Sequence, residues 1–299
     1  MIKRSAFAVL CAALTGLCVM ASPLFAADVD ERGMELGKKF VYKQSAGIPQ
    51  ELEVYFPSGV KPGGPKVPCV LLFHGGGWTG GDLSQFRYAC SYFASRGLVA
   101  ATANYRMLSK GDRQNEATGE NQRKRVCITD AKSAIRWMKQ HADELGLDPQ
   151  RIIVGGGSAG GHISVLASTT SGLDDPSDPK SYDTTAAAYL LFNPAFTAKD
   201  SSDPEVDVLR HLTADFPPAI LFFGTKDSWK NGSDAALQRL KALGNTTAEL
   251  WTAEGLGHGF YRDQPWQGLT LAAADRFLVE HGFLKGDCTL ALPKDGTQL

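Results

Sequence analysis

Residues 152–162 constrain the fold of this chain more than any other segment. The apolar residues Ile152-Ile153-Val154 are followed by five glycines that surround Ser158 and Ala159, and helix-compatible residues come next. A serine on so tight a strand-to-helix turn projects its hydroxyl above a sheet, and side chains two positions away on either side would clash. The pattern Gly156-x-Ser158-x-Gly160 therefore predicts that Ser158 is a nucleophile at the end of a strand.

A glycine-rich phosphate-binding loop is the alternative interpretation of the same residues. A dinucleotide-binding loop normally occupies the first strand-to-helix turn of an α/β region, with an acidic residue about 20 positions later at the end of the next strand. The strand before Ser158 lies well inside the α/β region, and the expected acidic residue is missing from the sequence. We therefore favour the nucleophile.

Strands and helices alternate along most of the chain, which predicts an α/β fold with a mostly parallel central sheet and helices on both faces. Val67–Phe73 is a continuous apolar run, typical of a strand buried on both faces. A hairpin is expected before it, and long polar loops are expected at Leu108–Arg125 and Gly172–Thr185. The predicted strands are Lys39–Gln44, Gln50–Phe56, Val67–Phe73, Leu98–Asn104, Arg151–Val154, Ala187–Phe192, Ala219–Phe223 and Ala248–Ala253, and the predicted helices are Leu83–Arg96, Thr129–Leu145, Gly160–Thr169, Asp234–Leu243 and Leu269–Glu280.

The N-terminal residues 1–26 have the pattern of a signal peptide: a basic start, an apolar run and small residues before Ala26. The apolar run of about 15 residues is shorter than the roughly 20 that a membrane-spanning helix needs. We expect cleavage after Ala26, a secreted or periplasmic location and no membrane span in the mature protein. Residues 27–285 are expected to form the catalytic domain, and 286–299 a loosely ordered tail.

The charge and the cysteines limit the classes of partner and of metal site. A formal net charge of −1 gives no basic surface for nucleic acid. Four cysteines follow the predicted signal, and no CxxC pair suggests zinc. Export permits a disulfide, and we favour Cys90 with Cys127 because they belong to two successive predicted helical segments; Cys69 is expected to be a core thiol.

A second glycine-rich segment, Phe73-His74-Gly75-Gly76-Gly77-Trp78, ends the first buried strand. An acyl-transfer enzyme must hydrogen-bond the oxygen that becomes negative in the tetrahedral intermediate, and consecutive glycines let backbone N–H groups approach it. We assign Gly76 and Gly77 as donors of this oxyanion hole, together with the N–H of Ala159.

The two motifs together resemble the hormone-sensitive-lipase-like group of α/β-hydrolases, and especially its bacterial secreted acetyl-xylan and feruloyl esterase branch. The resemblance rests on His74-Gly75-Gly76-Gly77, on Gly156-x-Ser158-Ala159-Gly160-Gly161 and on the segment Asp130–Trp137. It covers roughly Val41 to Phe283. It implies the α/β-hydrolase fold and a serine esterase activity. The acyl-serine mechanism expected of such an enzyme needs neither metal nor cofactor.

Histidine is the side chain whose ordinary pKa suits a base for the serine. Of six histidines, His258 is favoured, because it lies in a glycine-rich loop just after the last predicted strand. The acid that orients the base should come between serine and histidine in the chain. Asp227 follows the preceding strand and is favoured, with Glu254 as a possible substitute.

The short segment between Asn193 and Pro218 leaves little room for a cap, so an open, shallow site is expected. Such a site suits a small acyl group on a bulky alcohol, such as an acetylated polysaccharide, although a small lipophilic ester is an alternative. Trp78, Trp229 and His162 are assigned to substrate binding, and Trp266 also follows a strand end. A peptidase and a non-catalytic binding protein are less favoured, because no propeller-sized region precedes the domain and every catalytic role is filled.

Overall fold

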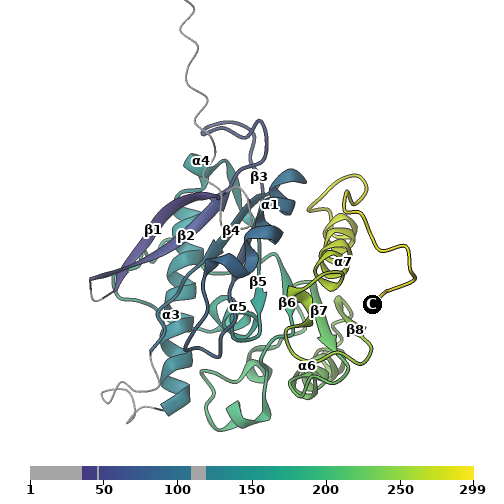
Figure 1. The fold of residues 1–299 in the computed structure, drawn as a ribbon. Coiled ribbons are helices and arrows are strands. Elements are labelled where there is room, and N and C mark those ends of the chain that lie inside the picture. The colour runs from purple at the N-terminus through teal and green to yellow at the C-terminus, as the bar shows by residue number, and fades with distance from the viewer. Residues whose placement is uncertain (1–35, 46, 109–118) are drawn as a thin grey trace, which may run out of the picture.

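A computed structural model describes residues 36–45, 47–108 and 119–299. Its strands form one sheet in the order β1-β2-β4-β3-β5-β6-β7-β8 (Figure 1). β1 and β2 form an antiparallel hairpin, β2 pairs antiparallel with β4, and every later pairing is parallel. The strands are β1 (Lys38–Ser45), β2 (Ile48–Tyr55), β3 (Val67–Phe73), β4 (Val99–Ala103), β5 (Leu147–Gly157), β6 (Ala188–Phe192), β7 (Ala219–Gly224) and β8 (Ala248–Ala253). The predicted α/β-hydrolase architecture is confirmed.

Helices cover both faces of the sheet. Residues of α3, α5 and α6 pack in one apolar cluster, and residues of α1 and α7 pack in a second cluster on the other face. The helices are α1 (Arg87–Ser95), α3 (Gly119–Gln140), α4 (Ala142–Leu145), α5 (Ala159–Thr169), α6 (Lys230–Ala242) and α7 (Trp266–Glu280), with short 3₁₀ helices at Leu83–Phe86, Ala198–Ser202, Val208–His211 and Phe260–Arg262.

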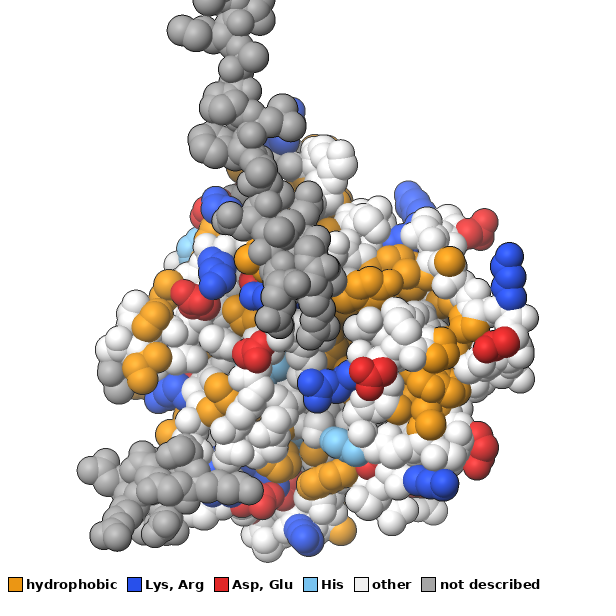
Figure 2. Space-filling view, in the orientation of Figure 1, with side chains coloured by type: hydrophobic (Ala, Val, Ile, Leu, Met, Phe, Trp, Pro, Cys, Tyr) orange, Lys and Arg blue, Asp and Glu red, His pale blue; other side chains and the backbone are white. Residues whose placement is uncertain are grey.

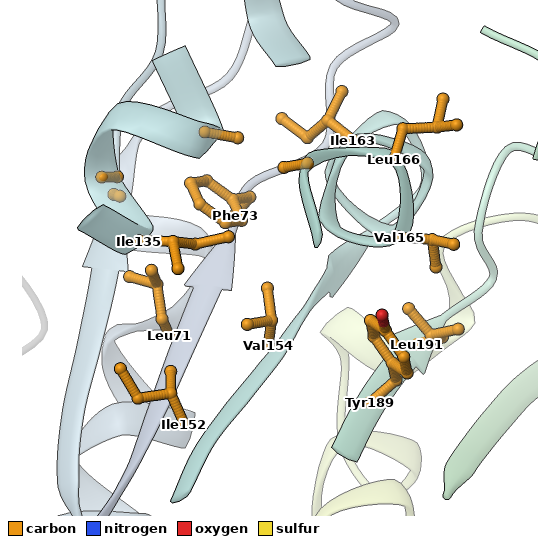
Figure 3. Close-up of a cluster of buried hydrophobic side chains, with 14 of the residues drawn as sticks. Leu71, Phe73, Ile135, Ile152, Val154, Ile163, Val165, Leu166, Tyr189 and Leu191 are labelled. Atoms are coloured by element: carbon orange, nitrogen blue, oxygen red, sulfur yellow. The ribbon is translucent and has the colours of Figure 1, made fainter. Parts of the chain in front are cut away.

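Alternate residues of the central strands divide the core between the two faces. In β3, Leu71 and Phe73 point to the cluster under α3 and α5, whereas Val70 and Leu72 point to the cluster under α1 and α7. Figure 3 shows the first cluster, in which side chains of the sheet meet Ile135 of α3 and residues of α5. Burial on both faces explains why β3 is an unbroken apolar run in the sequence.

The N-terminal part of α3 differs from the prediction. The helix begins at Gly119, well before the expected start at Thr129, so the end of the predicted loop Leu108–Arg125 is helical; residues 109–118 of that loop lie outside the described residues. Lys124 is fully buried and pairs with Asp200 at 2.5 Å and with Glu120 at 2.8 Å. The Asp200 partner is distant in sequence, so the local pattern of this polar segment did not predict the helix.

The predicted disulfide between Cys90 and Cys127 is wrong. Both residues are free thiols, as are Cys69 and Cys288. Cys90 lies in α1 and Cys127 in α3, which pack on opposite faces of the sheet, so the sheet separates the two sulfurs. Cys69 is a buried thiol of β3, as expected, and burial raises the pKa of the Cys69 and Cys127 thiols.

The chain after Leu284 has no helix or strand but contacts the domain. Cys288, Leu290 and Leu299 pack against the cluster under α1 and α7, and the Arg96 guanidinium donates to the carbonyls of Lys285 and Gly286. Figure 2 shows hydrophobic side chains gathered on this side of the molecule. The predicted signal peptide lies outside the described residues. No helix within the described ranges is both long and apolar enough to cross a bilayer.

Candidate active site

The turn from β5 into α5 holds Ser158 in an unusual backbone conformation. Its φ of 52° and ψ of −116° lie outside the regions that L-residues commonly adopt. The turn is fixed by the Ser158 N–H, which donates to the Phe192 carbonyl at 2.9 Å. A Cβ on Gly160 would lie 2.0 Å from the Phe73 carbonyl oxygen, so the close approach of β3 to α5 requires glycine there.

The structure brings Ser158, His258 and Asp227 together in the predicted order. His258 Nε2 lies 2.8 Å from Ser158 Oγ, and His258 Nδ1 lies 2.8 Å from Asp227 Oδ2. Both distances are within hydrogen-bonding range. One ring nitrogen therefore faces the hydroxyl and the other faces a carboxylate, the geometry that a nucleophile, its base and an orienting acid require.

Each of the three groups follows a different parallel strand. Ser158 follows β5, Asp227 follows β7, and His258 lies beyond β8, so all three gather at the carboxyl edge of the sheet. The Asp227 side chain is fully buried and also accepts from the Trp229 N–H at 2.9 Å, whereas the His258 side chain is 37% exposed. The carboxylate is thus fixed, and the imidazole faces a solvent-accessible space.

The predicted oxyanion-hole residues lie beside the serine. Gly76 and Gly77 follow β3, are exposed and have φ values of 129° and 62°. Ala159 begins α5, so its N–H is one of the first four in the helix that have no intrahelical partner. Gly76 and Gly77 line the same cavity as Ser158, and the Ala159 N–H belongs to the residue that directly follows the serine.

Sequence reasoning missed a polar link beneath this loop. Gln85 Oε1 accepts from the Gly75 N–H at 2.5 Å, and Gln85 Nε2 donates to the Tyr261 hydroxyl at 2.7 Å. A Cβ on Gly157 would meet that hydroxyl oxygen, so Tyr261 lies directly against the turn of Ser158. Gln85 and Tyr261 are far apart in the chain, and no local motif connects them.

Asn193, at the end of β6, was also missed. It is fully buried, has a φ of 41°, and its side chain contacts the His258 ring. The sequence offers one signal for it: it directly follows the apolar residues of a central strand, at the edge where the other site residues gather.

A cavity of about 580 Å³ opens above Ser158. Its walls come from the loops after β3, β5, β6, β7 and β8. The lining residues are Gly75, Gly76, Gly77, Gly81, Asp82, Ser84, Gln85, Ser158, Asn193, Trp229, His258, Gly259, Tyr261 and Arg262. Trp229 alone of the tryptophans considered in the sequence lines this cavity within the described part of the chain.

The predicted substrate-binding roles of Trp78 and His162 are wrong. Trp78 is 4% exposed and His162 is fully buried, and their rings meet edge to face at 5.3 Å behind the site. His162 Nε2 lies 2.9 Å from the Val206 carbonyl oxygen and 3.4 Å from Asp200 Oδ2. Burial acts to raise the pKa of Asp200, but hydrogen bonds to His162 and Lys124 hold it below its ordinary value.

Comparisons with known proteins identify related sequences. The family model BD-FAE matches residues 52–188. Esterase LipC of Mycobacterium tuberculosis is 28% identical over 227 residues, covering 65% of this chain and 53% of LipC. Carboxylesterase NlhH of the same organism is 32% identical over 116 residues, covering 38% of this chain and 32% of NlhH. The chain thus spans a third to about half of these curated relatives.

Solved structures match over a greater length. The apo form of Thermogutta terrifontis esterase 2 superposes with a TM-score of 0.75 at 36% sequence identity, covering 84% of this chain and 97% of that chain. Its propionate-bound form gives a TM-score of 0.74 at 34% identity, with 84% and 96% coverage. Sequence, fold and the arrangement of Ser158, His258 and Asp227 agree, and the chain belongs to the carboxylic ester hydrolases of the α/β-hydrolase fold.

Proposed function

We propose that this protein is an exported serine esterase that removes short, acetyl-type acyl groups from carbohydrate through an acyl-serine intermediate. The observation that carries the proposal is the pair of 2.8 Å contacts that join Ser158 Oγ to His258 Nε2 and His258 Nδ1 to Asp227 Oδ2. The signal-like residues 1–26 support export. Sequencing the N-terminus of the exported protein tests cleavage after Ala26.

In the first half of the reaction, His258 removes the proton of Ser158 as Oγ attacks the ester carbonyl carbon. The carbonyl π electrons move onto oxygen, and the N–H groups of Gly76, Gly77 and Ala159 stabilise that negative charge. Asp227 holds the imidazole and stabilises its protonated form. The intermediate then collapses, the alcohol leaves with the proton from His258, and the acyl group remains on Ser158.

In the second half, water replaces the alcohol. His258 removes a proton from water, which attacks the acyl carbonyl carbon, and the same N–H groups stabilise the second oxyanion. Collapse of that intermediate breaks the bond to Oγ, returns the proton to Ser158 and releases the carboxylic acid. Each proton that His258 accepts is thus given back within the same half-reaction.

A short acyl group is supported by the structural relatives. Thermogutta terrifontis esterase 2 has been solved with propionate and with butyrate bound, and also phosphorylated by paraoxon. A carbohydrate alcohol is supported by the exposed position of His258 and by Trp229 in the cavity wall, because an aromatic face can pack against a sugar ring.

A general carboxylesterase acting on small lipophilic esters is the second candidate. The named relatives LipC and NlhH favour it, since one is an esterase and the other a carboxylesterase. This candidate uses the same three residues and the same intermediate, and it differs only in the alcohol that leaves.

The experiment incubates the protein with acetylated xylan and, separately, with p-nitrophenyl acetate and butyrate. Ser158→Ala serves as the blank, and we expect it to lower kcat by a factor on the order of 10⁴ or more, because it removes the nucleophile. A Ser158→Ala variant that retains a tenth of the activity contradicts the proposed nucleophile.

The substrate comparison separates the two candidates. Acetate release from xylan at a rate near that from p-nitrophenyl acetate supports the carbohydrate esterase. Turnover of the small esters alone contradicts the carbohydrate substrate and supports the general carboxylesterase.

A further inference from the structure

Asn193 contacts His258, the general base, from a direction that Ser158 and Asp227 leave free. Its Nδ2 lies 3.2 Å from both His258 ring nitrogens. An atom at that distance from both nitrogens and in the plane of the ring would overlap Cε1, so the amide lies over a face of the imidazole. The in-plane directions of the two nitrogens are already occupied by Asp227 and Ser158.

The orientation of this amide is set by the backbone next to the histidine. The Gly259 N–H donates to Asn193 Oδ1 at 3.3 Å, and only the oxygen of an amide side chain accepts a hydrogen bond. The oxygen therefore faces the loop and the nitrogen faces the ring. One side chain thus holds both the His258 ring and the peptide that follows it.

The backbone of Asn193 is also held in place by a hydrogen bond and by burial. Its N–H donates to the Phe222 carbonyl of β7 at 2.8 Å, and the residue is fully buried at the end of β6. Its φ of 41° is left-handed, a conformation that asparagine adopts more readily than most non-glycine residues. The amide is therefore attached to the rigid sheet, whereas His258 lies on a loop.

We infer that Asn193 is the positioning residue for His258, which rests on the proposed serine-esterase function. It holds the imidazole between Asp227 and Ser158, and it places the partly positive amide nitrogen over the ring. The other charged groups around the ring are the Asp227 carboxylate and, in the cavity wall, Asp82 and Arg262.

Two substitutions distinguish the positioning of the His258 ring from the effect of the charge that lies over it. Asn193→Gly accepts the left-handed backbone and removes the amide. Asn193→Asp keeps the shape and the acceptor for Gly259 but places a carboxylate over the ring. Asn245→Gly is the matched control, because Asn245 is a buried asparagine that donates to the Ala214 and Phe216 carbonyls just before β7, at the opposite edge of the sheet.

The measurements are the rate at which a fluorophosphonate labels Ser158 and the kcat and KM for p-nitrophenyl acetate between pH 5 and pH 9. We expect Asn193→Gly to lower the labelling rate and kcat by about 10-fold or more, with KM changed less than about twofold. We expect Asn193→Asp to move the acid limb of kcat/KM upward by about one pH unit, because the carboxylate stabilises the protonated ring. We expect Asn245→Gly to lower the melting temperature without changing the labelling rate or the acid limb of kcat/KM.

Two results overturn the inference in distinguishable ways. If the wild-type protein labels and turns over ester, but both Asn193 variants keep its rates and its acid limb, Asn193 does not position the base and the proposed function stands. If the wild-type protein neither labels nor hydrolyses any of the esters, the proposed function fails and the role of Asn193 fails with it.

Discussion

The turn after β5 leaves no space for a side chain at Gly160. A Cβ there would lie 2.0 Å from the Phe73 carbonyl oxygen and 2.5 Å from that of His74, and both are backbone atoms that cannot rotate away. We expect Gly160→Ala to lower the free energy of unfolding by about 3 kcal/mol or more, since forced overlap in a packed interior is costly. Urea unfolding followed by circular dichroism measures this loss.

Gly257→Ala is the control for that prediction, because a Cβ at Gly257 meets no atom within 4 Å. We expect its free energy of unfolding to stay within about 1 kcal/mol of the wild type. Equal losses in the two variants would show that the close contact with Phe73 does not limit residue 160.

Among single residues, the sequence predicted those that belong to a recognisable local motif or follow a predicted strand. The glycines around Ser158 and the order of Asp227 and His258 were sufficient to assign them. Trp78 and His162 were misassigned, because adjacency to a motif does not tell on which side of the backbone a side chain lies. Asn193, Gln85 and Tyr261 were missed since their contacts join segments far apart in the chain.

The N-terminal half of α3 has charged side chains whose partners are distant in sequence. Lys124 is fully buried, and its ammonium pairs with Asp200 at 2.5 Å and lies 4.4 Å from the centre of the Trp78 ring. We expect Lys124→Met to lower the free energy of unfolding by about 3 kcal/mol, because it leaves the buried Asp200 carboxylate without its lysine partner. Denaturant unfolding measures the effect.

The double variant Lys124→Met/Asp200→Asn tests the cause of that loss. Removing both charges should recover part of the lost free energy of unfolding. If the double variant is less stable than the single one by the full cost of Asp200→Asn, the two side chains do not interact.

Contacts between segments that are distant in sequence explain which secondary-structure predictions failed. Strands such as β3 and β8 were predicted to the residue, because apolar runs between turn residues define them locally. The start of α3 was missed, since its polar residues find partners in the segment around Asp200. The Cys90–Cys127 pairing failed because the order of helices along a chain does not reveal which face of the sheet each one covers.

For the whole molecule, ion pairs around α3 link stability to pH. Asp174, Asp175, Asp183 and Asp200 pair with Lys132, Lys43, Lys139 and Lys124 respectively. Burial acts to raise the pKa of each carboxyl, but the lysines and neighbouring hydrogen bonds lower it, to about 2 for Asp183. Their folded-state pKa values thus lie below the unfolded value of 3.8, so they stabilise the fold fully above that value.

We therefore expect the melting temperature to fall as the pH drops from about 4 towards 2, the window between the unfolded and folded pKa values. Asp183→Asn removes one of these carboxyls and should make the fall less steep. Scanning calorimetry of both proteins between pH 7 and pH 2.5 measures the change, and a wild-type melting temperature that stays constant down to pH 2.5 would refute the link.

The left-handed backbone of Ser158 has a consequence for how such a protein evolves. An L-residue held at a φ of 52° and a ψ of −116° costs the folded state on the order of 1–3 kcal/mol, whereas glycine adopts such angles readily. The nucleophile Ser158 therefore makes the folded protein less stable than glycine at the same position would. A laboratory selection for heat resistance alone should enrich glycine at position 158 and lose ester cleavage. A selection for both properties must find its stabilising mutations elsewhere in the chain.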